Sequence, residues 1–332
     1  MIEPTTSVTG RIRLLMKVVR VHQWVKNVLI FLPLITSHTL MSWDAHLRPA
    51  LLMFLGFCCF ASAGYVCNDL LDLEADRNHP TKKNRPFASG AAPASWRHGL
   101  LPALLIAGLA LGAFIGFTAT CVLVIYLLVS LWYSLHLKRK VLLDAFVLAG
   151  FYTFRVIAGH VASDIEFSPW LLAFTMFLFL SLAFAKRHVE LLKLQDRQDA
   201  DGDDKPVLGR RGYILSDLDL VPVFGIASGF ICVLVLALYV GSDRITELYS
   251  APMILWLLCP LLLYWLCRVW ILSHRGQLHD DPVVFALRDR TTWFIAVLAA
   301  ALVWIATTGT PASDAPATSR APDRVLLAGG TS

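Results

Sequence analysis

Three aspartates with helical spacing lie at the end of a long apolar stretch of this sequence. Asp69, Asp72 and Asp76 are three and then four residues apart, so on a helix they share one face. Like charges at that spacing repel one another, and at a helix C-terminus they also oppose the helix dipole. A divalent cation would relieve both penalties, and grouped oxygen ligands suit Mg²⁺, which usually accompanies a phosphorylated substrate. The three aspartates are the predicted catalytic residues.

Basic residues follow the aspartates directly, and such side chains are the usual ligands of phosphate groups. A solvated acidic helix end is the alternative interpretation of the aspartates alone. Their position between an apolar segment and a run of cations favours a metal–diphosphate site instead. The cations of this run are Arg77, Lys82, Lys83 and Arg85.

The composition is that of a membrane protein. Of the 332 residues, 57% are hydrophobic and 16% are charged, and the mean hydropathy is +0.62. A soluble domain typically has about 45–50% apolar and about 25% charged residues. The net charge of +5 is spread over the segments between apolar stretches, so it indicates membrane topology and no nucleic-acid partner. Seven cysteines without a CxxC pattern predict neither a disulfide framework nor a zinc site.

Nine apolar segments are long enough to cross a bilayer, which takes roughly 20 helical residues each. We therefore expect an all-α polytopic membrane protein with a transmembrane domain over residues 25–308. The basic segment 1–24 is predicted to be an amphipathic helix on the membrane surface, and the tail 309–332 to be disordered. A very tight turn is expected near Gly116. The predicted spans are 25–43, 49–68, 98–116, 118–136, 141–162, 167–187, 217–241, 250–272 and 289–308.

Lysines and arginines fall unevenly on the two sides of these nine spans. With the N-terminus on one side, 24 of the 29 gather on that side. The asymmetry predicts a cytoplasmic N-terminus and an outer C-terminus in the inner (cytoplasmic) membrane. It also places the aspartates at the cytoplasmic surface, where diphosphate metabolites are found.

Further residues on the same face are candidates for binding substrate phosphates. For any one of them, an ordinary topology anchor or lipid-headgroup contact is the competing interpretation. Arg155 differs, because it falls inside the predicted span 141–162, and a charge at that depth needs a partner facing the bundle interior. Asp144, about three helical turns away, is a plausible partner only if the bundle brings the two residues close. The candidates are Lys26, Tyr133, Lys138, Arg139, Asp144, Arg155, Lys186 and Arg187.

The segment NDLLDLEADRNHPTKKNRPFASG, which begins at Asn68, resembles the first Asp-rich motif of the UbiA superfamily of membrane-embedded transferases. The resemblance covers most of the chain, from Arg20 to about the ninth span. It implies a nine-helix bundle with a cytoplasmic-side cavity for Mg²⁺ and a diphosphate. In this chain the metal ligands would be Asn68, Asp69, Asp72 and Asp76.

Two departures from the aromatic prenyltransferases of this superfamily distinguish the chain. Where those enzymes carry a second Asp-rich motif, after the sixth span, this sequence reads Lys186-Arg187-His188-Val189-Glu190. Asp196, Asp199 and Asp203 lie downstream, and we interpret them as solvated residues of a polar loop. The first motif also continues through Asp76-Arg77-Asn78-His79-Pro80-Thr81-Lys82, without the usual Arg-Thr.

Together with RVHQWVKNVLIFLPL, YSLHLKR and FRVIAG, these departures resemble the decaprenyl-phosphate phosphoribosyltransferase branch. That resemblance implies Mg²⁺-dependent transfer of 5-phosphoribose from phosphoribosyl pyrophosphate to a polyprenyl phosphate, a step of cell-envelope biosynthesis. The alternatives are prenyl transfer from a prenyl diphosphate to an aromatic or other small acceptor and, more distantly, lipid transport. Transporters tend to place polar groups near the midplane on broken helices, a pattern that this sequence lacks. Monomer and homo-oligomer both remain open.

Overall fold

The computed structural model describes residues 8–78, 82–93, 95–201, 212–278 and 282–308. Almost all of these residues are helical, and none forms a β-strand. Within this part of the chain, eight helices can cross a membrane by length and hydropathy, or nine if one bent pair counts as a span. The long helices are α3 (Arg48–Leu71), α5 (Trp96–Ile115), α6 (Phe117–Leu135), α7 (Leu143–Ser163), α8 (Pro169–Asp201), α9 (Leu220–Val240), α11 (Leu258–His274) and α13 (Arg290–Thr308).

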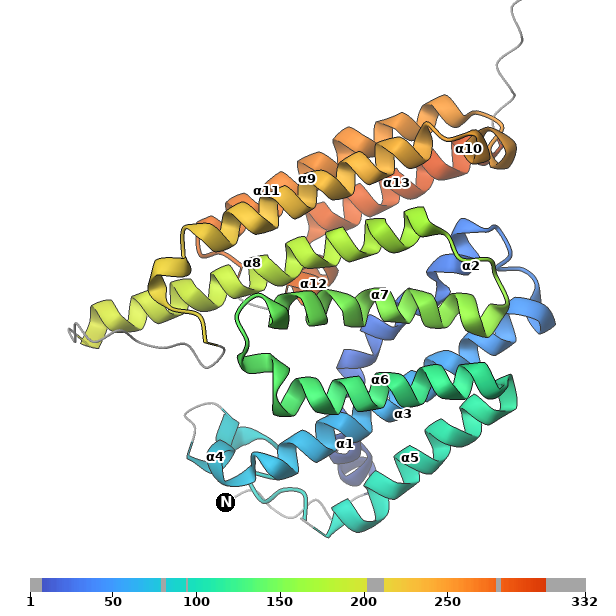
Figure 1. The fold of residues 1–332 in the computed structure, drawn as a ribbon. Coiled ribbons are helices and arrows are strands. Elements are labelled where there is room, and N and C mark those ends of the chain that lie inside the picture. Colours follow the sequence, from blue (N-terminus) through green and yellow to red (C-terminus); the bar gives the residue numbers. More distant parts are fainter. Residues whose placement is uncertain (1–7, 79–81, 94, 202–211, 279–281, 309–332) are drawn as a thin grey trace, which may run out of the picture.

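The long helices lie side by side, and α7 and α8 run through the middle of the bundle (Figure 1). Helices α3, α5 and α6 pack on one side of this pair, and α9, α11 and α13 pack on the other. At one end of the bundle, here called the α4 end, α3 leads into the short helix α4 (Leu73–Arg77). The opposite, α10 end carries α2 (Leu32–Thr36) and α10 (Asp243–Leu248).

Helix α7 belongs to two hydrophobic cores at once. Ala145, Ala149 and Tyr152 from its first half pack with α8, α9, α11 and α13. Ala158 and Ala162 from its second half pack with α3, α6 and the segment that precedes α3. The helix therefore joins the two sides of the bundle, and side chains between these two groups can reach the interior where the sides meet.

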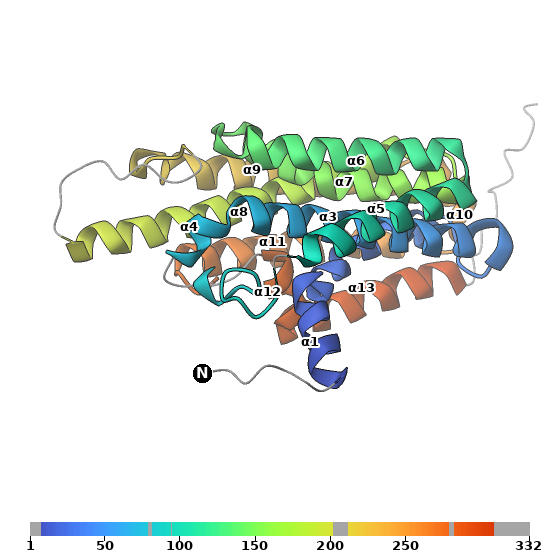
Figure 2. The ribbon, with the colours of Figure 1, turned by 90° about the horizontal axis from the view of Figure 1, so that it is seen from below.

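The first predicted span, 25–43, is not a regular transmembrane helix. The chain forms α1 (Val8–Val18), the 3₁₀ segment η1 (Val21–Phe31) and then α2, with a bend of 58° between Thr9–Val18 and Val21–Thr36. The bend lies between Val18 and Val21, where the backbone of Arg20 is left-handed at φ 54°, and Pro33 stands in the first turn of α2, a position that proline favours. In Figure 2, α1 projects from one side of the layer of long helices.

Seven of the other eight predicted spans are confirmed within a few residues, and so is the tight connection at Gly116, where φ is 151°. Helix α8 is the exception, because it runs to Asp201 and so carries Asp196 and Asp199 on a helix and not in a loop. Val189 and Leu191 are buried, so the apolar face of the helix continues past its membrane stretch. Asp203 and the predicted tail 309–332 lie outside the described residues.

Large apolar side chains cover the outside of the bundle. Phe114, Phe117, Trp304 and Val297 are each more than 60% exposed. A contiguous apolar exterior of this kind is stable in hydrocarbon and unfavourable in water. The chain is therefore a multi-pass membrane protein.

Candidate active site

Two of the three aspartates of the first motif meet at one arginine. Arg85 Nη1 lies 3.1 Å from Asp69 Oδ1 and 2.6 Å from Asp76 Oδ2. Arg20 Nη2 lies 2.6 Å from the same Asp69 oxygen, and Lys82 Nζ lies 3.9 Å from Asp76 Oδ1. Asp69 and Asp76 are 3% and 2% exposed, so these cations neutralise carboxylates that are largely withdrawn from water.

The local chain path explains why these two acids, and not all three, come together. Helix α3 ends at Leu71, and α4 begins at Leu73, so the motif does not lie on one continuous helix. Asp72 occupies the break and is half-exposed, and its side chain makes no ion pair or hydrogen bond with the described residues. The prediction of three carboxylates on one helical face is wrong in this respect.

The two paired carboxylates still fit a divalent cation. Across the described ranges, no three His, Cys, Asp or Glu side chains form a group that could hold a metal ion. However, Arg85 Nη1 bridges two carboxylate oxygens, and a cation of higher charge is suited to the same position. Asp72 lies at the break between α3 and α4, three residues after Asp69 and four before Asp76 in the chain.

A cavity of about 190 Å³ lies beside the motif, between α3, α6, α7 and η1. Asn68 connects the two, because it immediately precedes Asp69 and its Nδ2 donates to Ser134 Oγ in the cavity wall, at 3.1 Å. The wall combines cationic, phenolic and apolar groups. The lining residues are Lys26, Ala61, Gly64, Tyr65, Asn68, Tyr126, Ser130, Tyr133, Ser134, Leu148, Phe151, Tyr152 and Arg155.

Arg155 is held in this wall by three hydrogen bonds. Its Nε donates to Asn27 Oδ1 at 2.7 Å, Nη1 to the Phe151 carbonyl oxygen at 2.6 Å, and Nη2 to Tyr126 Oη at 3.0 Å. The guanidinium carbon also lies 5.2 Å from the Tyr126 ring centre and 5.7 Å from that of Tyr152. No carboxylate takes part in these contacts, so they supply no counter-charge to the guanidinium, and an anion in the cavity would be attracted to it.

Gly159 fixes the distance between Arg155 and Asn27. It lies four residues after Arg155 and therefore on the same face of α7. A Cβ at this position would lie 2.1 Å from the Ile30 carbonyl oxygen of η1, so only glycine permits this approach. The segment FRVIAG thus combines a cavity-lining arginine with the glycine that brings its hydrogen-bond partner within reach.

The expected pairing of Arg155 with Asp144 is wrong. Asp144 instead faces Arg187, with Oδ2 at 2.8 Å from Arg187 Nε, and it accepts a hydrogen bond from Tyr213 Oη at 2.8 Å. Arg187 also pairs with Glu190. Asp144 and Arg187 are almost fully buried, so the pair fastens α7 to α8 and contributes no free charge to the cavity.

The remaining predicted residues are more scattered. Lys26 and Tyr133 line the cavity, and Lys82 and Arg85 contact the carboxylates. Arg77, Lys83 and Arg139 are exposed, whereas Lys138 and Lys186 are half-exposed and are not among the cavity-lining residues.

Sequence reasoning missed three members of the site. They are Arg20, Tyr126 and Tyr152. Arg20 contacts Asp69, Tyr126 accepts a hydrogen bond from Arg155, and Tyr152 lines the same cavity. Arg20 stands just before the first predicted span, where a basic residue is typical of a topology anchor, and it opens the segment RVHQWVKNVLIFLPL. The two tyrosines lie in apolar segments, where the sequence gives no sign that they face a cavity and not lipid.

A helical membrane bundle with a carboxylate pair and a cationic cavity at one end is consistent with a membrane-embedded transferase, the class to which the following family match assigns the chain. Residues 30–293 match the model of the UbiA prenyltransferase family. The chain belongs to this family.

Relatives with curated names fall into two groups. The chain is 40% identical to protein y4nM of Sinorhizobium fredii, over 85% of this chain and 53% of that one. It is 32% identical to the nodulation protein NoeC of Azorhizobium caulinodans, over 85% of this chain and 89% of that one. It thus spans about half the length of y4nM. It is also 31% identical to the decaprenyl-phosphate phosphoribosyltransferase of Mycolicibacterium smegmatis, over 89% of this chain and 91% of that one.

Solved structures share the fold at low identity. A UbiA homologue from Archaeoglobus fulgidus bound to GPP and Mg²⁺ superposes with a TM-score of 0.62 and 16% identity, covering 88% of this chain and 98% of that one. A digeranylgeranylglyceryl phosphate synthase gives a TM-score of 0.60 at 17% identity, covering 89% and 98%. These similarities confirm a UbiA-like helical bundle.

Proposed function

We propose that the protein transfers 5-phosphoribose from phosphoribosyl pyrophosphate to a polyprenyl phosphate and releases pyrophosphate. Relatives named decaprenyl-phosphate phosphoribosyltransferase at 31–36% identity support this assignment within the family. The names of y4nM and NoeC specify no substrate, so the chemistry of the site must carry the choice.

The observation that carries the proposal is the basic character of the site outside the first motif. The position of the expected second acidic motif is occupied by Lys186 to Glu190, and its arginine is buried against Asp144. Among the described residues, the cavity wall contributes Lys26 and Arg155 and no carboxylate. One acidic set and a cationic cavity suit two substrates that each carry phosphate, one of them chelated with metal.

In this proposal the donor pyrophosphate lies at the motif and the acceptor phosphate lies in the cavity. Asn68, Asp69, Asp72 and Asp76 would hold Mg²⁺, which supplies stabilisation of the charge that develops on the leaving pyrophosphate. Lys82 and Arg85 would turn from the carboxylates to the pyrophosphate or the 5-phosphate when the metal binds. The other sequence-based candidates for phosphate contacts are Arg77, Lys83, Lys138, Arg139, Lys186 and Arg187.

The reaction needs positioning more than proton transfer. An oxygen of the acceptor phosphate forms the new bond to ribose C1 while the bond from C1 to the pyrophosphate oxygen breaks and its electron pair leaves with pyrophosphate. A phosphate monoester is already anionic near neutral pH, so no general base is required. Lys26 and Arg155 would orient that oxygen, and Tyr126 and Asn27 would hold the Arg155 guanidinium rigid.

Prenyl transfer from a prenyl diphosphate to a small acceptor is the second candidate. It is favoured by two structural neighbours, UbiA homologues bound to GPP or DMAPP together with Mg²⁺. Both reactions use a metal-chelated diphosphate leaving group, so the first motif serves either. They differ in which substrate carries the lipid.

A paired assay separates the two candidates. Membranes that contain the protein are incubated with labelled phosphoribosyl pyrophosphate plus polyprenyl phosphate, and in parallel with a labelled prenyl diphosphate plus an aromatic acid. We expect lipid-extractable label only in the first reaction, and none in membranes with Asp72→Asn. Product only in the second reaction would refute phosphoribosyl transfer.

The distribution of lysines and arginines further supports an inner-membrane location with the α4 end in the cytoplasm. Most lysines and arginines lie in the segments that join the spans at the α4 end, and cytoplasmic loops carry such an excess of basic residues. Cysteine introduced at Lys140 is expected to react with a membrane-impermeant maleimide only after the cells are opened. Labelling in intact cells would reverse this orientation.

A further inference from the structure

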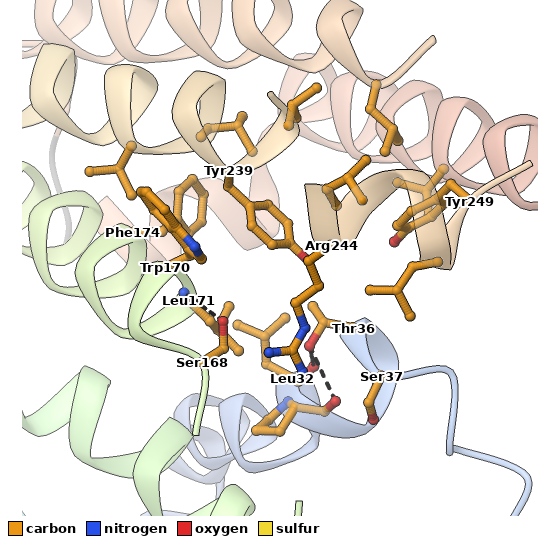
Figure 3. A pocket seen from close by; sticks show the side chains of 18 of the residues that line it. Leu32, Thr36, Ser37, Ser168, Trp170, Leu171, Phe174, Tyr239, Arg244 and Tyr249 are labelled. Atoms are coloured by element: carbon orange, nitrogen blue, oxygen red, sulfur yellow. Dashed lines mark hydrogen bonds between the residues drawn. The ribbon is translucent and has the colours of Figure 1, made fainter. Parts of the chain in front are cut away.

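A second and larger cavity lies at the α10 end of the bundle, opposite the candidate active site. Its volume is about 380 Å³, which lies within the range of small-molecule sites. Figure 3 shows its walls, which come mainly from α2, α8, α9, α10 and the segment before α11. Most of the lining is apolar, with Leu32, Leu171, Phe174 and Leu236 among the side chains. Nothing in the proposed transfer reaction requires this cavity.

One charged pair belongs to the cavity lining. Arg244 Nη2 lies 3.7 Å from Glu166 Oε2, and their side chains are 50% and 82% exposed. Figure 3 shows Arg244 extending from α10 toward α2 and toward Ser168. An exposed pair at this distance contributes little to stability, so each group can give up this contact and bind a ligand instead. They offer one positive and one negative group at the same cavity.

A buried histidine supplies a second, independent sign of a ligand. His160 lines the cavity and is 2% exposed. Its Nδ1 lies 3.2 Å from the Ile165 carbonyl oxygen and acts as the donor, which leaves Nε2 as an acceptor. Nε2 has no hydrogen-bond partner among the residues that the structure describes. Buried polar atoms are normally satisfied, so Nε2 marks a place for a donor that these residues do not supply.

We propose that this cavity binds one phosphatidylethanolamine molecule from the leaflet at the α10 end. The apolar walls would receive an acyl chain, Arg244 would bind the phosphate, and Glu166 would accept hydrogen bonds from the primary ammonium. The headgroup is zwitterionic, as is the Arg244–Glu166 pair, so each charge of the lipid meets its opposite. Tyr239, Tyr249 and Trp170 also line the site, as aromatic side chains do at the level of lipid headgroups.

A comparison with phosphatidylcholine and phosphatidylglycerol tests whether the cavity recognises both charges of the headgroup. Phosphatidylcholine keeps both charges but has no N–H donor for Glu166. Phosphatidylglycerol keeps the phosphate but has no cation, so its negative charge lies next to an unpaired carboxylate. The geometry therefore predicts a preference for phosphatidylethanolamine over both lipids, whereas a nonspecific apolar crevice would bind all three lipids equally.

The test is native mass spectrometry of the purified full-length protein with each lipid at equal concentration. We expect one phosphatidylethanolamine retained per chain, with at least tenfold weaker retention of the other two lipids. Arg244→Gln and Glu166→Gln should each weaken retention of phosphatidylethanolamine about tenfold. Equal retention of the three lipids by the wild-type protein would overturn the proposal.

A matched control is available at the same end of the bundle. Arg48 pairs with Asp44 at 3.6 Å, the two are 59% and 82% exposed, and neither lines the cavity. Arg48→Gln should therefore leave lipid retention unchanged. Leu171→Trp, which fills the cavity from α8, should abolish it. The assignment fails if Arg48→Gln weakens retention as much as Arg244→Gln does. It also fails if Arg244→Gln weakens retention and Glu166→Gln does not, because the site then does not recognise a zwitterion.

The measurement is independent of catalysis. Mass spectrometry measures bound lipid directly, so the test needs no substrate. The cavity and the candidate active site also lie at opposite ends of the bundle. A failed transfer assay therefore leaves this result unaffected, and absence of a bound lipid leaves the proposed transfer unaffected.

Discussion

Arg187 Nε lies 2.8 Å from Asp144 Oδ2, and both side chains are almost entirely buried. Tyr213, from the segment after α8, donates to the other oxygen of Asp144 and accepts from the Leu142 backbone N–H at 3.0 Å. Gly212 permits this approach, because a Cβ there would lie 2.8 Å from the Arg139 carbonyl oxygen. The cluster holds the start of α7, the middle of α8 and the chain after α8 together beside the cavity.

Removing one partner of this pair should destabilise the protein strongly. Arg187→Met leaves Asp144 buried without its counter-charge, which typically costs about 3–5 kcal/mol. We expect a lower midpoint of thermal unfolding for the purified protein. The double variant Arg187→Met/Asp144→Leu removes both charges and should recover most of the loss. A single variant as stable as the wild type would show that the pair does not hold α7 and α8 together.

The same cluster predicts a dependence of stability on alkaline pH. Burial, together with the nearby Asp144 carboxylate, raises the pKa of Tyr213 above its ordinary value of about 10. A raised pKa in the folded state gives stability that is complete below the unfolded value and is lost as pH rises above about 10. Thermal unfolding measured from pH 8 to 11 should show this decline. Tyr213→Phe should show a smaller decline, and an equal one would contradict the assignment.

The aspartates of the first motif should separate into two kinds of variant. Asp72 has no ionic partner among the described side chains, so Asp72→Asn should lower turnover by roughly 100-fold or more without changing the thermal midpoint. Asp69→Asn weakens the contacts with Arg20 and Arg85 as well, so it should lower both turnover and stability. Assays of turnover and thermal unfolding on the same preparations test this. Full turnover in Asp72→Asn would exclude this residue from the metal site.

Chelation of divalent cations should abolish activity but leave the fold intact. Arg20, Lys82 and Arg85 already neutralise the buried carboxylates, so the protein does not depend on metal to offset their charge. We expect loss of turnover in EDTA, recovery when Mg²⁺ is restored, and an unfolding midpoint that stays the same. Unfolding in EDTA would show instead that the metal is structural.

Arg155→Lys should impair binding of the acceptor more than binding of the donor. Lysine keeps the charge but cannot reproduce the three directed hydrogen bonds to Asn27, Phe151 and Tyr126. Hydrogen bonds to charged groups are worth about 1.5–3 kcal/mol each, so KM for polyprenyl phosphate should rise roughly 10-fold to 100-fold. KM for phosphoribosyl pyrophosphate should change little. Lys140→Gln, an exposed cation at the same end, should change neither, and a rise in the donor KM alone would place Arg155 at the other phosphate.

Most of the fold was predictable from hydropathy, because a span buried in lipid must be apolar along its whole length. The exceptions have local causes. The first span is irregular because its chain is a 3₁₀ helix up to Phe31 and the α-helix that follows ends at Thr36, and no apolar pattern records such a change. Helix α8 outruns its apolar stretch because Val189 and Leu191 still pack against neighbouring helices.

The site was less predictable than the fold because it depends on which helices become neighbours. Residue spacing placed three aspartates on one helix, but α3 ends within the motif and only Asp69 and Asp76 meet. The partner of Arg155 came from η1, 128 residues earlier in the chain, and Asp144 found Arg187. Sequence separation carries no information about such pairings.

The contact between Gly159 and the Ile30 backbone couples the position of the first segment to the shape of the cavity. Any larger residue at 159 would push η1 outward and carry Asn27 away from Arg155, which alters the charged wall without touching a residue that lines it. In the proposed function, acceptor preference therefore depends on this contact as well as on the residues that line the cavity. An engineer who wishes to admit a bulkier acceptor would begin at that contact and leave the cavity lining unchanged.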